Sequence, residues 1–216
     1  MKFALLIIAA YLLGAIPFGL IIARAYGKDL FKIGSGNIGA TNLSRALGKK
    51  WAYVCFLLDV LKGAIPVAIA STLISKEPTI TELLLWLAVG LAAVIGHIFS
   101  IYINFRGGKG VSTSFGVALG IWPYYTICAV AAFAVWACVV FIWRYISLGS
   151  IIASIIFPIT LIAAIAIDKR WQFANLWPLV AVGILIPVMV ITRHRSNIKR
   201  IIEGTENKVF AKKQTA

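Results

Sequence analysis

The sequence predicts an all-α, polytopic transmembrane helix bundle of seven spans, with the N-terminus outside and the C-terminus in the cytoplasm. Of its 216 residues 61% are hydrophobic and only 13% are charged, whereas a soluble domain carries about a quarter charged residues. Apolar runs of spanning length alternate with short polar segments, which hold most of the net charge of +14. A water-soluble globule cannot bury this much apolar surface, so we expect much of it to face lipid.

The lengths of the apolar runs define the spans, because a bilayer core of about 30 Å requires about 20 apolar residues in a helix. The interval from Val111 to Trp143 holds 33 residues, which would be about 50 Å long as one helix. Pro123 interrupts it, so we divide it into a short span and a full one. The seven expected spans are Phe3–Ala23, Trp51–Ser75, Leu83–Ile103, Val111–Trp122, Pro123–Trp143, Ser150–Ile167 and Leu176–Thr192.

The basic residues set the expected topology, because Lys and Arg accumulate on the cytoplasmic side of a membrane. Six lie between positions 24 and 50, and seven follow Thr192. Both segments face the same side only if the number of spans is odd, which favours seven over six. We expect residues 1–216 to form one membrane domain. The seven basic residues of the tail are Arg193, Arg195, Lys199, Arg200, Lys208, Lys212 and Lys213.

The first polar segment reads Gly34-Ser-Gly-Asn-Ile-Gly-Ala-Thr-Asn42. Its glycines permit tight turns, and successive bare backbone N–H groups form an anion-binding cradle. We expect a helix to begin near Thr41, so that its N-terminus faces a phosphate, with Arg45 one turn further on. The alternative interpretation is a plain glycine-rich turn at the membrane interface.

The second polar segment, Arg106-Gly107-Gly108-Lys109-Gly110, lies between the third and fourth expected spans. Arg offers a planar fork and Lys a compact charge, and both suit phosphate. The spacing is not that of a Walker A loop. The general bias of basic residues toward the cytoplasm explains the two charges but not the three glycines, so we predict a second phosphate-binding loop.

Two further segments carry weaker signals. Ser147 stands near the start of the sixth span, where helix capping is an alternative explanation for a hydroxyl. His194 and Asn197 are three residues apart on a helix that leaves the membrane. Attraction to anionic lipid explains the arginines around them but not the nearby Glu203 and Glu206.

Three ionisable residues lie inside expected spans, where such groups are costly and usually paired or functional. We expect Asp59 and Lys62 to form an ion pair that supports the site, and His97 to be a buried, hydrogen-bonded side chain. The cysteines lack metal-type spacing, so no metal or other cofactor is expected. We expect all three to be small core residues: Cys55, Cys128 and Cys138.

The runs Gly34–Asn42, His97–Gly110 and Arg193–Glu206, together with 59–63 and 147–150, resemble the bacterial acyl-phosphate:glycerol-3-phosphate acyltransferases over nearly the whole chain. The resemblance implies transfer of a fatty acyl group from acyl phosphate to the sn-1 hydroxyl of glycerol 3-phosphate. The products are 1-acyl-glycerol 3-phosphate (lysophosphatidic acid) and phosphate, in the first acylation step of phospholipid synthesis. It also implies a multi-pass protein of the bacterial cytoplasmic (inner) membrane, with its active site facing the cytoplasm.

The resemblance also implies roles for the polar residues. The 34–42 loop would hold the acyl-phosphate head group, and Arg45, Lys109 and Ser147 the phosphate of glycerol 3-phosphate. His194 and Asn197 would position its hydroxyls, and either a substrate phosphate or His194 would accept the proton. The expected catalytic residues are Ser35, Lys109, His194 and Asn197. The expected binding residues are Gly34, Gly36, Asn37, Gly39, Thr41, Asn42, Arg45, Arg106, Gly107, Gly108 and Ser147.

Two other classes of function remain alternatives. A transporter for a phosphorylated metabolite would suit a basic cavity, but transporters carry repeats and broken helices near the midplane. A non-catalytic lipid-binding scaffold would not need glycine-rich loops. We expect membrane lipids and the two substrates as partners, and neither nucleic acid nor an obligatory protein partner.

Overall fold

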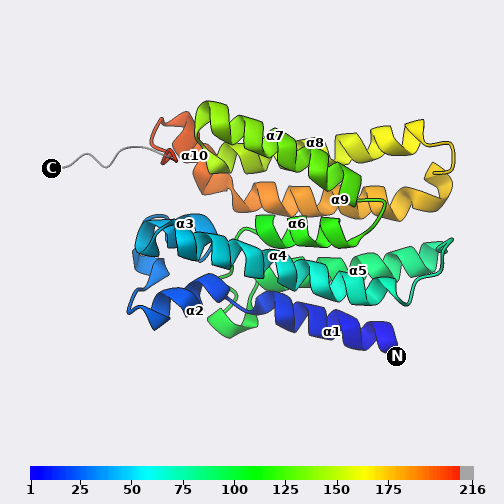
Figure 1. Cartoon of the computed structure of the whole chain (residues 1–216), viewed down its shortest axis with the longest axis horizontal. Helices are drawn as coiled ribbons and strands as arrows, with labels where there is room; N and C mark the ends of the chain where they lie inside the picture. Colours follow the sequence, from blue (N-terminus) through cyan, green and yellow to red (C-terminus); the bar gives the residue numbers. More distant parts are fainter. Residues whose placement is uncertain (210–216) are drawn as a thin grey trace.

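The computed structural model describes residues 1–209, which form a bundle of helices without a strand. Lys212 and Lys213, two of the tail residues counted above, lie outside the described residues. Most helices run along the long axis of the molecule (Figure 1). The elements are α1 (Lys2–Ala15), α2 (Phe18–Ala25), η1 (Leu30–Lys32), α3 (Ala40–Leu47), α4 (Lys49–Ser71), α5 (Ile80–Ile98), η2 (Ile101–Ile103), α6 (Val111–Gly120), α7 (Thr126–Trp143), α8 (Ile146–Ile167), α9 (Phe173–Arg193) and α10 (Arg195–Ile202).

Six helical segments of the described chain are long and apolar enough to cross a bilayer, and α6, with 10 residues, is shorter. At about 1.5 Å per residue α6 is about 15 Å long, half of a bilayer core. Large side chains on the outside of the bundle are exposed, among them Phe141 at 85% and Ile167 at 80%. Such a surface is that of a multi-pass integral membrane protein. Cys55 and Cys128 are buried as expected, but Cys138 is exposed on α7, so its assignment to the core was wrong.

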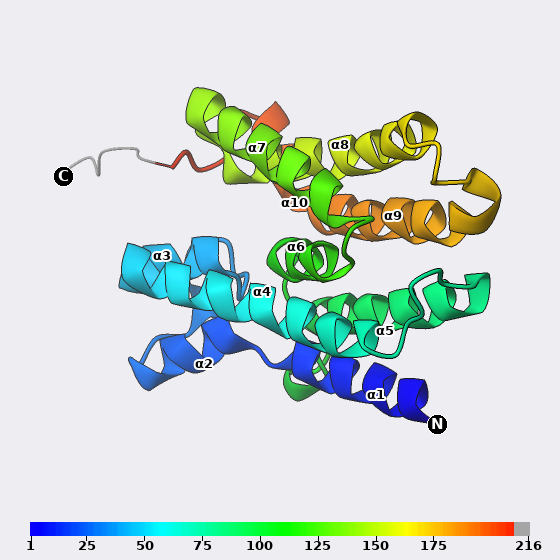
Figure 2. The same cartoon turned by 45° about the vertical axis from the view of Figure 1, so that its right-hand side comes forward.

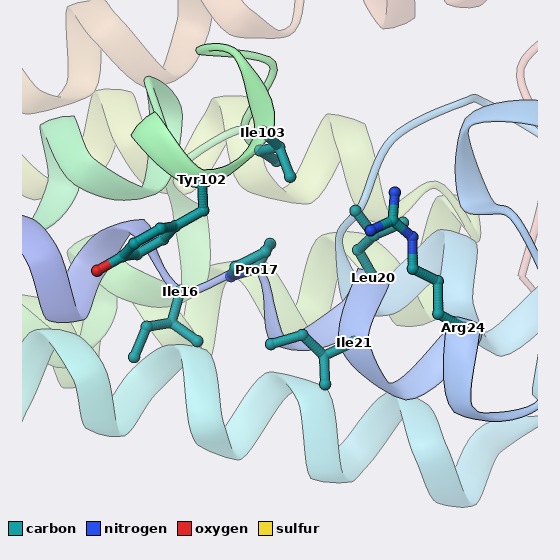
Figure 3. A pocket seen from close by; sticks show the side chains of 7 residues that line it. All are labelled: Ile16, Pro17, Leu20, Ile21, Arg24, Tyr102 and Ile103. Atoms are coloured by element: carbon teal, nitrogen blue, oxygen red, sulfur yellow. The ribbon is translucent and has the colours of Figure 1, made fainter.

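The first span is not one helix, because α1 ends at Ala15 and α2 begins at Phe18. The expected span over Phe3–Ala23 is therefore present as the segment Lys2–Ala25, but two helices build it. Pro17 has no N–H and its ring disfavours the preceding turn. A break of this kind needs other donors for the freed carbonyl groups. The break also leaves a hollow of about 330 Å³ in which Arg24 is the charged side chain (Figure 3). It is lined by Ile16, Pro17, Leu20, Ile21, Arg24, Tyr102 and Ile103.

Two glycines bring helices α4 and α6 into backbone contact. A Cβ atom on Gly63 of α4 would overlap the carbonyl of Thr113 in α6, and one on Gly116 of α6 would overlap the carbonyl of Val60 in α4. Small residues permit this close approach between membrane helices. The N-terminus of α6, which begins two residues after Lys109, is thereby held against α4.

The polar segments collect at one end of the bundle. Figure 1 shows α2, α3 and α10 at the end opposite the N-terminus, and Figure 2 shows α6 between the α4–α5 pair and α9. A separate small core joins α2, η1, α3 and α4 beneath the 34–42 loop. This core consists of Leu20, Ala23, Leu30, Ile38, Leu43 and Cys55.

Candidate active site

The loop that joins η1 to α3 has the compact shape expected of an anion cradle. Gly34 and Gly36 have positive φ angles of 55° and 66°, which favour glycine. Asn42 is 2% exposed. Its Nδ2 lies 2.9–3.1 Å from three carbonyl oxygens of η1 and the loop, and its Oδ1 accepts from the N–H of Ser35 at 3.1 Å. The Asn42 amide thus supports the loop through both its nitrogen and its oxygen.

Helix α3 begins at Ala40, next to the expected Thr41. Its N-cap is Gly39, whose N–H donates to Asn37 Oδ1 at 3.0 Å. Arg45, in the last turn of α3, extends back over the loop. Its side chain comes so near to Gly34 that a Cβ atom on this glycine would meet it. Glu206 and Arg200 are also electrostatic neighbours of Arg45. Arg45 therefore lies near both the glycine loop and the C-terminal segment.

The second glycine loop lies against the end of α5. The N–H of Gly108 donates to the carbonyl of His97 at 3.0 Å, and Arg193 donates to the carbonyl of Gly107 at 3.3 Å. Gly110, with φ of 88°, is the N-cap of α6. These contacts hold the backbone on both sides of Lys109.

Lys109 belongs to a hydrogen-bonded cluster that four separate segments build. Its Nζ lies 2.5 Å from Asn197 Oδ1, and Asn197 Nδ2 donates to Glu206 Oε1 at 2.6 Å. Ser147 donates to the same carboxylate oxygen at 2.7 Å, and Arg200 Nε donates to the other oxygen at 2.7 Å. Burial alone would raise the pKa of Glu206, but the bonds from Asn197, Ser147 and Arg200 hold it below its ordinary value.

The charge of Lys109 is poorly compensated. Burial lowers the pKa of its ammonium group to about 8, and the positive charges of Arg200, Arg45 and Arg193 act in the same direction, while Glu206 opposes them. An ammonium group in such surroundings gains from the arrival of an anion. The cluster is therefore suited to binding a phosphate.

His194 is 2% exposed and stands at the bend between α9 and α10. Its Nδ1 donates to the carbonyl of Val190 at 2.7 Å, so Nε2 is the acceptor nitrogen of the neutral ring. Burial, together with the charge of Lys109, lowers its pKa to about 4. His194 can thus accept a hydrogen bond from a hydroxyl at neutral pH, but it is a weak base.

The structure brings together five of the predicted residues, which are Arg45, Lys109, Ser147, His194 and Asn197. Ser35 lies exposed on the glycine loop, whereas Arg106 is exposed and stands outside the Lys109 cluster. Among residues 1–209 no group of three or more potential metal ligands gathers.

Glu206 and Arg200 are the residues that the sequence-based prediction of the site omitted. Glu206 accepts hydrogen bonds from three side chains, whereas Glu203 lies 3.7 Å from the exposed Lys199. An acidic residue in a strongly basic tail was the available signal, but it did not distinguish between the two glutamates.

The chain is similar to known proteins over nearly its whole length. The family described as "Glycerol-3-phosphate acyltransferase" matches residues 4–204. Curated relatives with that name include one from Geobacter sulfurreducens, 44% identical over 94% of this chain and 95% of its own length. Another, from Macrococcus caseolyticus, is 44% identical over 99% of this chain and 100% of its own length.

The fold is also similar to a solved structure. The crystal structure of PlsY (YgiH), described as an integral membrane glycerol 3-phosphate acyltransferase in its glycerol 3-phosphate form, superposes with a TM-score of 0.84 at 39% identity. The match covers 96% of each chain. The chain therefore belongs to the glycerol-3-phosphate acyltransferase family.

Proposed function

We propose that this chain transfers a fatty acyl group from acyl phosphate to the sn-1 hydroxyl of glycerol 3-phosphate. The products are 1-acyl-glycerol 3-phosphate and inorganic phosphate, and the step begins phospholipid synthesis. The observation that carries this proposal is the hydrogen-bonded cluster of Lys109, Asn197, Ser147 and Glu206, with Arg45 between it and the glycine loop. Two anion-binding elements at one end of the bundle suit a reaction between two phosphorylated substrates.

Each element has its own substrate in this proposal. The 34–42 loop cradles the head group of acyl phosphate with backbone N–H groups and the Ser35 hydroxyl. Lys109, Arg45 and Ser147 hold the phosphate of glycerol 3-phosphate, while His194 and Asn197 orient its hydroxyls. The lowered pKa of Lys109 supports this assignment, because a dianionic phosphate supplies the missing counter-charge.

The chemistry depends mainly on orientation and electrostatic stabilisation. The sn-1 hydroxyl oxygen attacks the acyl carbon, the bond from that carbon to the phosphate oxygen breaks, and inorganic phosphate leaves. The hydroxyl proton passes to a substrate phosphate, whose second pKa is about 6. The pKa of His194, about 4, supports a role in orienting the hydroxyl rather than in removing its proton.

We also propose seven crossings, with the N-terminus outside and the polar end of the bundle in the cytoplasm of a bacterial cell, so that the protein resides in the inner membrane. Figure 1 supports this, because α6 runs along the bundle axis in the middle of the molecule, and leads from the end of α5, away from the polar end, to the start of α7. The short α6, fourth along the chain, then brings the number of crossings from six to seven, and it packs against α4, α5 and α7. The basic tail and the 24–50 segment meet the positive-inside rule in this orientation.

The test is release of phosphate from acyl phosphate by the detergent-purified protein, with and without glycerol 3-phosphate. We expect release that requires glycerol 3-phosphate and that matches the formation of 1-acyl-glycerol 3-phosphate mole for mole. Acyl-coenzyme A serves as the control donor and should support no transfer. Release that is independent of glycerol 3-phosphate, or equal transfer from acyl-coenzyme A, would contradict the proposal.

A further inference from the structure

Three ionisable side chains lie buried in the helices beside the candidate site. Asp59 and Lys62 of α4 are each 3% exposed, and His97 of α5 is 5% exposed. Lys62 Nζ lies 2.8 Å from Asp59 Oδ1, which confirms the expected ion pair, and His97 Nδ1 lies 3.8 Å from the same oxygen. Burying charges is costly even when they are paired, so their presence calls for a role beyond stability.

Lys62 also contacts the break in the first span. Its Nζ donates to the carbonyl of Ile16 at 2.8 Å, and the Ser100 hydroxyl donates to the carbonyl of Ala15 at 2.5 Å. The ion pair therefore fastens α4 to the residue before Pro17. Helix α2 begins just after this residue and packs against the glycine loop. The contact is so close that a Cβ atom on Gly19 would overlap the carbonyl of Ile38.

His97 contacts the other anion-binding element. Its carbonyl accepts the N–H of Gly108 at 3.0 Å, and a Cβ atom on Gly108 would overlap His97 Nε2. Nδ1 of His97 is buried without a hydrogen-bond partner among residues 1–209, and Asp59 is the charged group beside it. The turn before Lys109 thus rests on the His97 backbone and ring.

We propose that Asp59, Lys62 and His97 are positioning residues that fix the 34–42 loop and the 107–110 loop relative to one another. Asp59 is the common partner of the other two. Lys62 pairs with Asp59 and donates to the Ile16 carbonyl, and His97 lies beside Asp59 and contacts Gly108. None of the three touches a substrate in this arrangement. The proposal rests on the proposed function for its kinetic consequence, but the geometry that it describes is independent of that reaction.

A paired replacement separates positioning from simple stabilisation. Removing one partner of a buried ion pair leaves an uncompensated charge and is strongly destabilising, whereas replacing both by neutral groups of similar size is often tolerated. The double variant Asp59→Asn with Lys62→Met therefore keeps the bundle neutral at this point. It loses the donor to the Ile16 carbonyl.

The experiment measures amide hydrogen exchange and steady-state kinetics on this double variant in detergent. We expect a thermal unfolding temperature near that of the unmodified protein. Exchange in residues 34–39 and 107–110 should be at least tenfold faster, and kcat at least tenfold lower. Exchange and kcat equal to those of the unmodified protein would overturn the proposal.

A second variant, His97→Ala, leaves the ion pair intact and remains informative if the double variant does not fold. We expect at least tenfold faster exchange in 107–110 only, and at least a tenfold higher KM for glycerol 3-phosphate. Unchanged exchange in 107–110, or an equal increase throughout the bundle, would overturn the proposal. Because exchange is read without the reaction, an unmodified protein that transfers no acyl group would refute the proposed function alone.

Discussion

Lys109 Nζ and Asn197 Oδ1 lie 2.5 Å apart although 88 residues separate them in the chain. The Asn197 amide continues to Glu206 at 2.6 Å, so one amide joins the cation of the second loop to a carboxylate of the tail. The position of the ammonium group consequently depends on residues that follow the last long helix. Changes in the tail should therefore reach the phosphate site.

The first prediction concerns the charge of Lys109. Lys109→Ala removes the cation from the cluster and should lower kcat/KM for glycerol 3-phosphate at least about 100-fold, the size found when one electrostatic donor is lost. Glycerol 3-phosphate-dependent phosphate release measures this effect, and thermal unfolding confirms that the variant is folded. Lys28→Ala is the matched control, because Lys28 is exposed outside the cluster, and it should retain its activity. A Lys109→Ala rate close to that of the unmodified protein would remove the residue from the site.

The second prediction is an alkaline limit to activity. Burial among basic neighbours lowers the pKa of Lys109 to about 8 in the free protein, and kcat/KM reports the pKa values of the free enzyme. We therefore expect kcat/KM for glycerol 3-phosphate to fall as the pH rises through about 8. Lys109→Arg should lose this decline, because a guanidinium group stays protonated to above about pH 12. An identical decline in Lys109→Arg would show that another group titrates.

The third prediction distinguishes the two glutamates of the tail. Glu206→Gln removes the charge that accepts from Ser147, Asn197 and Arg200, and it should lower the free energy of unfolding by about 1–3 kcal/mol. Glu203→Gln changes only an exposed contact with Lys199, so its effect should stay within about 0.5 kcal/mol. Unfolding of both variants in the same detergent measures the difference. Equal losses in the two variants would contradict a special role for Glu206.

The sequence predicts the helices well because the bilayer sets their length. Helix α8 runs for 22 residues without a charged side chain, and Pro158 inside it does not end the helix. Pro17 does end α1, and the difference arises from side chains remote in sequence. Lys62 and Ser100 donate hydrogen bonds to the carbonyl groups at that break. The sequence around Pro17 cannot predict donors that lie so far away in the chain.

Only part of the candidate site can be predicted from the sequence, because some of its contacts join residues that lie far apart in the chain. Composition and spacing identify the glycine loops and Lys109, because these features are local. The support of a loop by Asn42 depends on where the chain folds back upon itself, as does the choice between Glu203 and Glu206. From residue type alone we expect Asn42 among the residues that contact the ligand. Its hydrogen bonds show that its amide supports the loop backbone.

The last prediction tests whether the shape of the first glycine loop matters for the reaction. Gly34 has φ of 55°, and a Cβ atom there would overlap Asn42 Oδ1, whereas Gly27 has φ of 67° with open space around the position of its Cβ. Both alanine variants bear the cost of a left-handed residue, about 1–2 kcal/mol. Only Gly34→Ala must also displace the side chain that holds the loop together.

We therefore expect Gly34→Ala to raise KM for acyl phosphate at least about tenfold, since the backbone N–H groups of the cradle would no longer converge. Gly27→Ala should lower stability by a similar amount and leave KM unchanged. Initial rates at varied acyl phosphate, with thermal unfolding alongside, measure both effects. Parallel changes of KM in the two variants would show that backbone strain, and not the form of the anion cradle, governs binding of the acyl donor.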